Sequence, residues 1–201
     1  SFGYHVSNFF AVSSRQGTPE ELKHLIADAH AYGMDVIMDI VPNHIGPDGN
    51  YLPQTGPYKF YAGKFGDVPN FEKLPDNKYV RDWMTNSALW WLTEYKVDGL
   101  RFDAVASMLY LDYDKRPGEW VPNIYGDNKC LEAMAFFKKL NGAVFGEFPD
   151  ALMIAEESTA WPKVTHDVEE DGLGFDYKWN MGWMNDSLRY MALDPYFRKY
   201  N

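Results

Sequence analysis

Arg101 and Asp103, an arginine and an aspartate two residues apart, are the residues of this chain best placed to do chemistry. They end a short apolar run, and alternate residues of a β-strand point to the same face. The guanidinium would then favour the ionised form of Asp103. An ionised carboxylate at the tip of a strand is suited to attack a glycosidic carbon. A purely structural ion pair is the alternative interpretation.

Candidate groups follow two other apolar runs. The first run contains Asp39 and is followed by His44, and the second ends in Glu156 and Glu157. Neighbouring parallel strands lie about 4.8 Å apart, so carboxylates at adjacent tips can reach the separation of about 5–5.5 Å found in retaining glycosidases. Asp103 would be the nucleophile of such a pair. Glu156 would be the general acid, because the apolar strand before it favours a raised pKa.

These residues also have simpler explanations. His44 could be an ordinary loop or core histidine, Asp39 could merely brace Arg101, and the Glu156-Glu157 pair could be solvated. A carboxylate and histidine metal site is a further possibility. No H-x-x-x-H motif or cysteine pair supports it, so we expect no metal.

Helices and strands alternate along the chain, which predicts an α/β fold with a parallel sheet. We expect strands over residues 35–41, 97–103, 151–155 and 174–178. We expect helices over residues 19–32, 78–95, 128–145 and 183–191, with a capping box at Thr18 and Glu21, and long loops over 46–78 and 107–127. A complete (β/α)₈ TIM barrel takes about 250 residues. We therefore expect residues 1–201 to be a single segment of such a barrel, with about four consecutive β/α units and the remaining strands missing.

Composition excludes some classes of partner. The formal net charge of −10 argues against nucleic acid or anionic membrane as a partner bound through bulk charge. No apolar run approaches the roughly 20 residues of a membrane span. A single cysteine, Cys130, excludes an internal disulfide framework, and we expect it to be a buried, inert thiol. These features, with no signal-like N-terminus, favour the cytoplasm. Aromatic residues make up 17%, which fits either a bulky core or platforms for sugar rings.

Three motifs carry a resemblance to a known family. The segment Asp39-Ile-Val-Pro-Asn-His44 resembles the first signature of the α-amylase superfamily, glycoside hydrolase family 13. Gly99-Leu-Arg-Phe-Asp103 resembles the second, and the end of Met153-Ile-Ala-Glu156 resembles the third. Within the superfamily, the sequence looks most like the glycogen (1,4-α-glucan) branching enzymes. The segments that carry this likeness are 1–4, 9–18, 104–113, 118–123, 155–159, 172–175 and 178–183.

The resemblance implies a reaction and a role for each matching residue. Asp103 would be the nucleophile and Glu156 the general acid/base of an enzyme that cuts an α-1,4-glucan such as glycogen or amylose. The cut chain would be held as a glycosyl ester and passed to a 6-hydroxyl, which forms an α-1,6 branch in glycogen biosynthesis. The resemblance implies no cofactor. The substrate-binding residues would be Tyr4, Asp39, His44 and Arg101.

In detail, Tyr4 would stack on the sugar at the cleavage subsite. His44 and Arg101 would hold that sugar and the nucleophile, and Asp39 would support Arg101. Other functions stay open, because residues 46–78 look more like trehalohydrolases or other amylase relatives, which are hydrolases. The fourth signature of the family, which carries a third acidic residue, has no match in the sequence. We therefore expect little or no activity from this chain alone, and a non-catalytic glucan-binding role is the third possibility.

Overall fold

The computed structural model describes residues 2–58, 60–71 and 78–200. Within them a four-stranded parallel sheet has the order β1-β4-β5-β6. Its strands are β1 (Ile37–Ile40), β4 (Gly99–Phe102), β5 (Leu152–Ala155) and β6 (Tyr177–Lys178). A helix lies between most successive strands, so the fold is α/β and has the architecture of a partial barrel. The four predicted strands are confirmed, and each is shorter than predicted.

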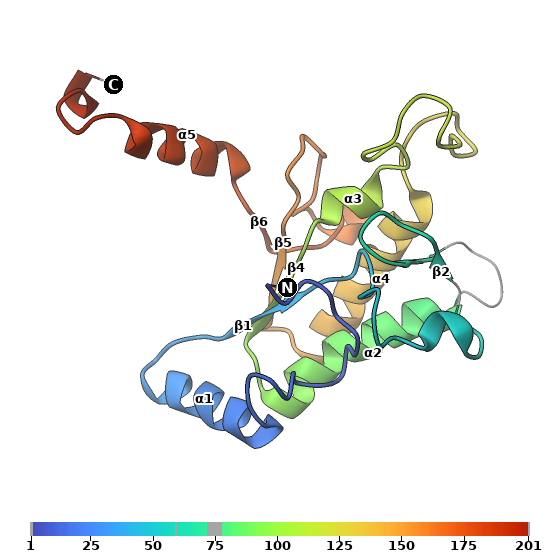
Figure 1. Ribbon diagram of the computed structural model, residues 1–201, viewed down its shortest axis with the longest axis horizontal. Helices are drawn as coiled ribbons and strands as arrows, with labels where there is room; N and C mark the ends of the chain where they lie inside the picture. The colour runs from blue at the N-terminus through green and yellow to red at the C-terminus, as the bar shows by residue number, and fades with distance from the viewer. Residues whose placement is uncertain (1, 59, 72–77, 201) are drawn as a thin grey trace.

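The helices are α1 (Pro19–Ala31), α2 (Lys78–Tyr95), α3 (Val105–Leu109), α4 (Leu131–Glu147) and α5 (Met181–Ala192). Short 3₁₀ turns cover η1 (Leu52–Gln54), η3 (Val168–Glu170) and η4 (Arg198–Tyr200). Figure 1 shows α2 and α4 side by side next to the sheet, with α5 extending away from the rest of the chain. No helix in the described residues is long and apolar enough to cross a membrane.

The helix starts follow local capping chemistry. Thr18 and Glu21 form the predicted capping box, in which each side chain accepts a hydrogen bond from the other residue's backbone N–H. The helix α4, predicted over 128–145, begins at Leu131, three residues later than predicted. Asn128 lies before the helix, where its side chain donates to the carboxylate of Asp112. Cys130 is consequently the N-cap residue of α4 and only partly buried, although burial still raises the pKa of its thiol.

The two predicted long loops contain regular structure. A short antiparallel pair, β2 (Phe60–Tyr61) and β3 (Val68–Pro69), lies within 46–78, and residues 59 and 72–77 of that segment are outside the described residues. The helix α3 occupies the start of the second expected loop. Its single apolar turn is buried against the core, and tertiary packing of this kind outweighs weak local helix signals.

The core lies between the sheet and helices α2 and α4. Leu100 and Phe102 of β4 are fully buried, and the Phe102 ring meets that of Phe137 on α4 at 6.2 Å between centroids. Arg101, between them, points to the opposite face because strand side chains alternate. The strands β4 and β5 approach closely at Gly99, where a Cβ atom would lie 2.3 Å from the carbonyl oxygen of Leu152. The ends of these strands are thereby held at a fixed spacing.

Candidate active site

Arg101 is the centre of the candidate site. Its Nη1 donates to both carboxylate oxygens of Asp39, at 2.6 and 2.7 Å, and to Asp103 Oδ1 at 3.0 Å. Its Nη2 donates to Glu156 Oε2 at 2.7 Å. The sheet register explains this meeting, because Asp39 on β1 is paired directly with Arg101 on β4. The structure thus brings together the acidic groups of three adjacent strands, as their sequence positions predicted.

The guanidinium of Arg101 is buried but well compensated. Burial alone would lower its pKa, yet the hydrogen bonds and negative charges of Asp39, together with the charges of Glu156 and Asp103, hold the pKa above its usual value. The guanidinium also lies over the ring of Trp179, with Arg101 Cζ 4.4 Å from the ring centroid. Trp179 follows β6, and its N–H continues the strand pairing by donating to Ala155. Sequence reasoning missed this residue, and its place at the end of the weakest strand was the only available signal.

Glu156 is held at the end of β5 in a setting that favours its protonated form. Burial raises the pKa of its carboxyl group, and the nearby Asp103 raises it further by charge and by hydrogen bonding. The backbone N–H of Ala104, 2.9 Å from Glu156 Oε2, and the charge of Arg101 oppose this shift without cancelling it. Ala104 has a left-handed backbone, with φ of 47°, which turns the chain directly after Asp103.

Asn43 connects Asp103 to His44. Its Nδ2 donates to Asp103 Oδ2 at 3.1 Å and to the Asp103 carbonyl at 3.0 Å, while its Oδ1 lies 2.5 Å from His44 Nδ1. Asn43 therefore links His44 to the nucleophile candidate by hydrogen bonds. Burial, followed by the charge of His5, lowers the pKa of His44. The sequence places Asn43 beside His44 in the first motif, but sequence reasoning gave it no role in the site.

Tyr4 closes the β1 side of the site. Its hydroxyl donates to Asp39 Oδ2 at 2.9 Å, and this hydrogen bond raises the pKa of the tyrosine. The side chain is still 40% exposed, so its ring remains open to solvent beside the carboxylates. His44 Nε2 is buried and has no hydrogen-bond partner within the described residues. The ring of Tyr4 is therefore free to contact a ligand, whereas His44 Nε2 lies beneath the surface of the site.

Glu157 differs from its neighbour Glu156. It is completely buried, so the interpretation of the Glu156-Glu157 pair as solvated is wrong for Glu157. Its carboxylate forms an ion pair of 2.9 Å with Lys178 and accepts the backbone N–H of Thr159 at 3.1 Å. A buried carboxylate needs such partners, because desolvation would otherwise be costly.

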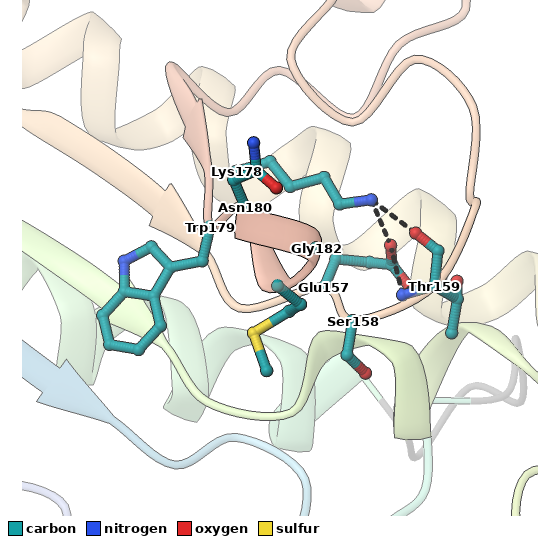
Figure 2. Close-up of a pocket in the computed structure, with 8 residues that line it drawn as sticks. Glu157, Ser158, Thr159, Lys178, Trp179, Asn180 and Gly182 are labelled. Carbon is teal, nitrogen blue, oxygen red and sulfur yellow. Dashed lines mark hydrogen bonds and ion pairs between the residues drawn. The ribbon is translucent and has the colours of Figure 1, made fainter. Parts of the chain in front are cut away.

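A pocket of about 430 Å³ opens between the ends of β5 and β6 (Figure 2). Trp179 lines this pocket and also packs against Arg101, so the pocket adjoins the group of carboxylates around Arg101. The lining residues are Glu157, Ser158, Thr159, Lys178, Trp179, Asn180, Met181 and Gly182. No group of three or more His, Cys, Asp or Glu side chains in the described ranges is arranged to hold a metal ion.

The comparisons with known proteins agree with this geometry. Residues 1–65 match the family model described as the α-amylase catalytic domain. The chain is 47% identical over 212 residues to the 1,4-α-glucan branching enzyme GlgB of Butyrivibrio fibrisolvens, which covers 99% of this chain and 32% of the relative. It is 48% identical over 207 residues to GlgB of Rubrobacter xylanophilus, covering 100% of this chain and 29% of that protein. The chain thus spans about a third of the length of these relatives.

Solved structures give the same fold. The crystal structure of a putative α-amylase from Salmonella typhimurium superimposes with a TM-score of 0.61 at 27% identity, covering 87% of this chain and 27% of that one. The α-amylase of Geobacillus thermoleovorans has a TM-score of 0.59 at 22% identity, covering 88% of this chain and 37% of that one. The partial-barrel prediction is therefore confirmed.

Proposed function

We propose that this chain is part of an enzyme of the α-amylase superfamily and supplies the nucleophile and the acid of a 1,4-α-glucan branching reaction. The observation that carries the proposal is the single guanidinium of Arg101, which holds Asp103 and Glu156 together at neighbouring strand ends. Two carboxylates in such proximity, one of them biased toward protonation, are the machinery of retaining glycoside cleavage.

In the first step Asp103 attacks the anomeric carbon of an α-1,4-linked glucose. A bond forms between its carboxylate oxygen and that carbon, and the bond from the carbon to the glycosidic oxygen breaks. The leaving oxygen takes its proton from Glu156, whose raised pKa keeps it protonated to a higher pH. The product is a glycosyl ester on Asp103, and Glu156 is left ionised.

In the second step the 6-hydroxyl of another glucan chain attacks the same carbon. Its proton passes to Glu156, the new carbon–oxygen bond forms, and the ester bond to Asp103 breaks. Both carboxyl groups thereby return to their starting states, so the cycle requires no cofactor. Arg101 stabilises the Asp103 carboxylate as the ester bond breaks, because its Nη1 already donates to that side chain.

Tyr4 and His44 are the proposed contacts to the sugar at the point of cleavage. The exposed ring of Tyr4 provides an aromatic surface next to Asp39, and apolar sugar faces stack on such rings. The buried Nε2 of His44 lacks a partner among the described residues, and a sugar hydroxyl would supply one. Asp39 fixes Arg101 through both of its carboxylate oxygens.

Branching is favoured over simple hydrolysis by the extent of the similarity. The relatives named as branching enzymes match 99% and 100% of the chain, a range that includes residues 46–78. The glucan substrate, a role in glycogen synthesis and a location in the cytoplasm form part of the proposal.

Incubation of the full native protein with amylose tests the proposal. New α-1,6 linkages and new reducing ends are scored separately, since transfer creates the former and hydrolysis the latter. We expect α-1,6 linkages from the wild type and a loss on the order of 10⁴-fold or more in Asp103→Ala, as for removal of other enzymatic nucleophiles. Asp48→Ala, which removes an exposed carboxylate outside the site, is the matched control. Reducing ends without branches would establish a hydrolase instead.

A further inference from the structure

We infer that the pocket between β5 and β6 binds the acceptor chain, the glucan whose 6-hydroxyl receives the transferred segment. This inference rests on the proposed function and adds to it a site for the second substrate. The pocket is outside the group of side chains around Arg101 but shares Trp179 with it. Its volume of about 430 Å³ lies in the range of about 300–1,000 Å³ typical of ligand pockets.

The order of the strands places this pocket on the acceptor side. The nucleophile candidate follows β4 and the acid/base candidate follows β5, while the pocket lies beyond them, between β5 and β6. The acid/base group is the one that must touch both the leaving oxygen and the incoming hydroxyl. A chain that approaches from the β6 side therefore meets Glu156 first, whereas Tyr4 and His44 lie on the β1 side.

The chemistry of the lining fits a neutral polyhydroxylated ligand. Glu157 and Lys178 neutralise each other in an ion pair, so the pocket offers no uncompensated charge to attract an ionic ligand. Within the described residues, Ser158 Oγ and the Asn180 amide nitrogen make no hydrogen bond to other side chains or backbone. A hydroxyl and an amide of this kind can bind sugar hydroxyl groups.

The pocket also has an aromatic end. Figure 2 shows the indole of Trp179 on one side of the pocket and the bonded group of Glu157, Lys178 and Thr159 on the other. Trp179 is 48% exposed although its ring lies over Arg101. An aromatic platform at one end and polar groups at the other match the apolar faces and polar rim of a glucose unit.

The ion pair of Glu157 and Lys178 gives the pocket a fixed wall. It joins the loop after β5 to the last residue of β6, and Lys178 also donates to the carbonyl of Thr159 at 2.5 Å. The β5 loop that carries Glu156 is thus tied to the strand that carries Trp179. A sugar bound in the pocket would be positioned relative to Glu156 without further ordering of the chain.

Two variants block the pocket from two different segments that line it. Ser158→Phe adds a large side chain at an exposed position after β5, and Gly182→Leu adds one in the first turn of α5. Gly182 has an ordinary backbone and leucine is a better helix former than glycine, but the new Cβ atom would lie 3.3 Å from Asn180 Oδ1, which must shift slightly. Far-UV circular dichroism and thermal unfolding of the variant check that it is folded. Gly142→Leu makes the same chemical change in α4, where a Cβ atom meets nothing within 4 Å, and is the matched control.

The measurement is the number of α-1,6 linkages formed per donor cleaved by the full native protein, with α-maltosyl fluoride as donor, whose small fluoride leaving group does not need the pocket, and maltoheptaose as acceptor. We expect both blocking variants to lower this ratio at least about tenfold, the discrimination that one steric contact commonly gives, while cleavage of the donor continues with water as the acceptor. More maltoheptaose should partly restore transfer, and the control should match the wild type.

An unchanged ratio in both folded variants would overturn the acceptor site and leave the branching activity standing. Equal loss of cleavage and transfer would indicate a structural role for the pocket and would also overturn the inference. If the wild type itself released reducing ends and formed no branches, the proposed function would fail, and the acceptor site would fail with it.

Discussion

Asn43 donates a hydrogen bond from Nδ2 to Asp103 Oδ2 over 3.1 Å, and thereby fixes the side chain that is proposed to attack the substrate. Because its amide nitrogen serves Asp103, its oxygen faces His44 Nδ1 and must accept from it. The neutral imidazole then carries its proton on Nδ1 and leaves Nε2 as an acceptor for a sugar hydroxyl. The lowered pKa of His44 agrees with a neutral ring.

Replacement of Asn43 by aspartate should change the pH dependence of the reaction. Asn43→Asp puts a further carboxylate next to Asp103 without a further cation, and carboxylates that share a site cannot all ionise easily. Activity that needs ionised Asp103 should therefore be lost at a higher pH on the acidic side of the profile. The profile of kcat/KM for amylose measures this shift.

Asn43→Ala is the control for that experiment. It removes the same hydrogen bonds without adding charge, so kcat should fall by roughly 10–100-fold, the cost of one or two lost positioning hydrogen bonds. The acidic limb of the pH profile of kcat/KM should stay nearly unchanged. If both variants shifted the acidic limb equally, charge repulsion would not be its cause.

Glu156→Gln should stabilise the folded protein at neutral pH. The pKa of Glu156 is raised in the folded state by burial, so the folded form binds this proton more tightly than the unfolded form. The stabilisation from this proton is fully present below the pKa that Glu156 has in the unfolded state. It is lost as the pH rises through the higher pKa that Glu156 has in the folded state. Glutamine mimics the protonated acid and avoids that loss.

Urea unfolding of wild type and Glu156→Gln at several pH values provides the check. The free energy of unfolding of the variant should exceed that of the wild type near pH 7, and the difference should vanish below about pH 4, where glutamate is protonated in both states. A variant less stable than the wild type at pH 7 would mean that the ion pair of Glu156 with Arg101 outweighs the desolvation of its carboxylate.

Two glycine to alanine substitutions should have opposite effects on stability. In Gly99→Ala the new Cβ atom would lie 2.3 Å from the backbone oxygen of Leu152, so β4 and β5 must separate, and we expect destabilisation of about 3 kcal/mol or more. Gly142→Ala in the open face of α4 should stabilise the protein by about 0.5–1 kcal/mol. Thermal unfolding of the pair measures both, and equal effects would contradict the close approach at Gly99.

The 201-residue chain expressed by itself should self-associate and show little or no activity on amylose. None of the residues of α5 is buried, and Trp183, Leu188 and Met191 are 70%, 61% and 60% exposed. Apolar surface of this kind, with the unpaired edges of β1 and β6 among the described strands, promotes association. Light scattering that reported a single monomeric species, or turnover of amylose by the chain, would contradict this prediction.

Local sequence signals predicted the elements well where the signal is itself local. The capping box at Thr18 fixed the start of α1, because its two hydrogen bonds form within one turn. The apolar runs at 97–103 and 151–155 predicted strands, and β4 is buried along its whole length while β5 is buried at alternate residues. The run at 35–41 predicted a strand buried on both faces, which is wrong for β1, where only Ile40 is buried because β1 is an edge of the described sheet. The helix α3 and the strands β2 and β3 were missed, because each is too short to show periodicity and is held by distant contacts.

The sequence by itself determined which side chains end each strand, and so that Asp39, Arg101, Asp103 and Glu156 meet at one edge of a parallel sheet. Only the tertiary structure decided how they meet. Asn43 stands between His44 and Asp103, and Trp179 covers Arg101. It also decided that Glu157 is buried beside a pocket. The physical reason is that strand alternation and parallel pairing are encoded by neighbours along the chain. A contact between the tips of different strands depends instead on the register of the whole sheet and on the packing of the loops above it.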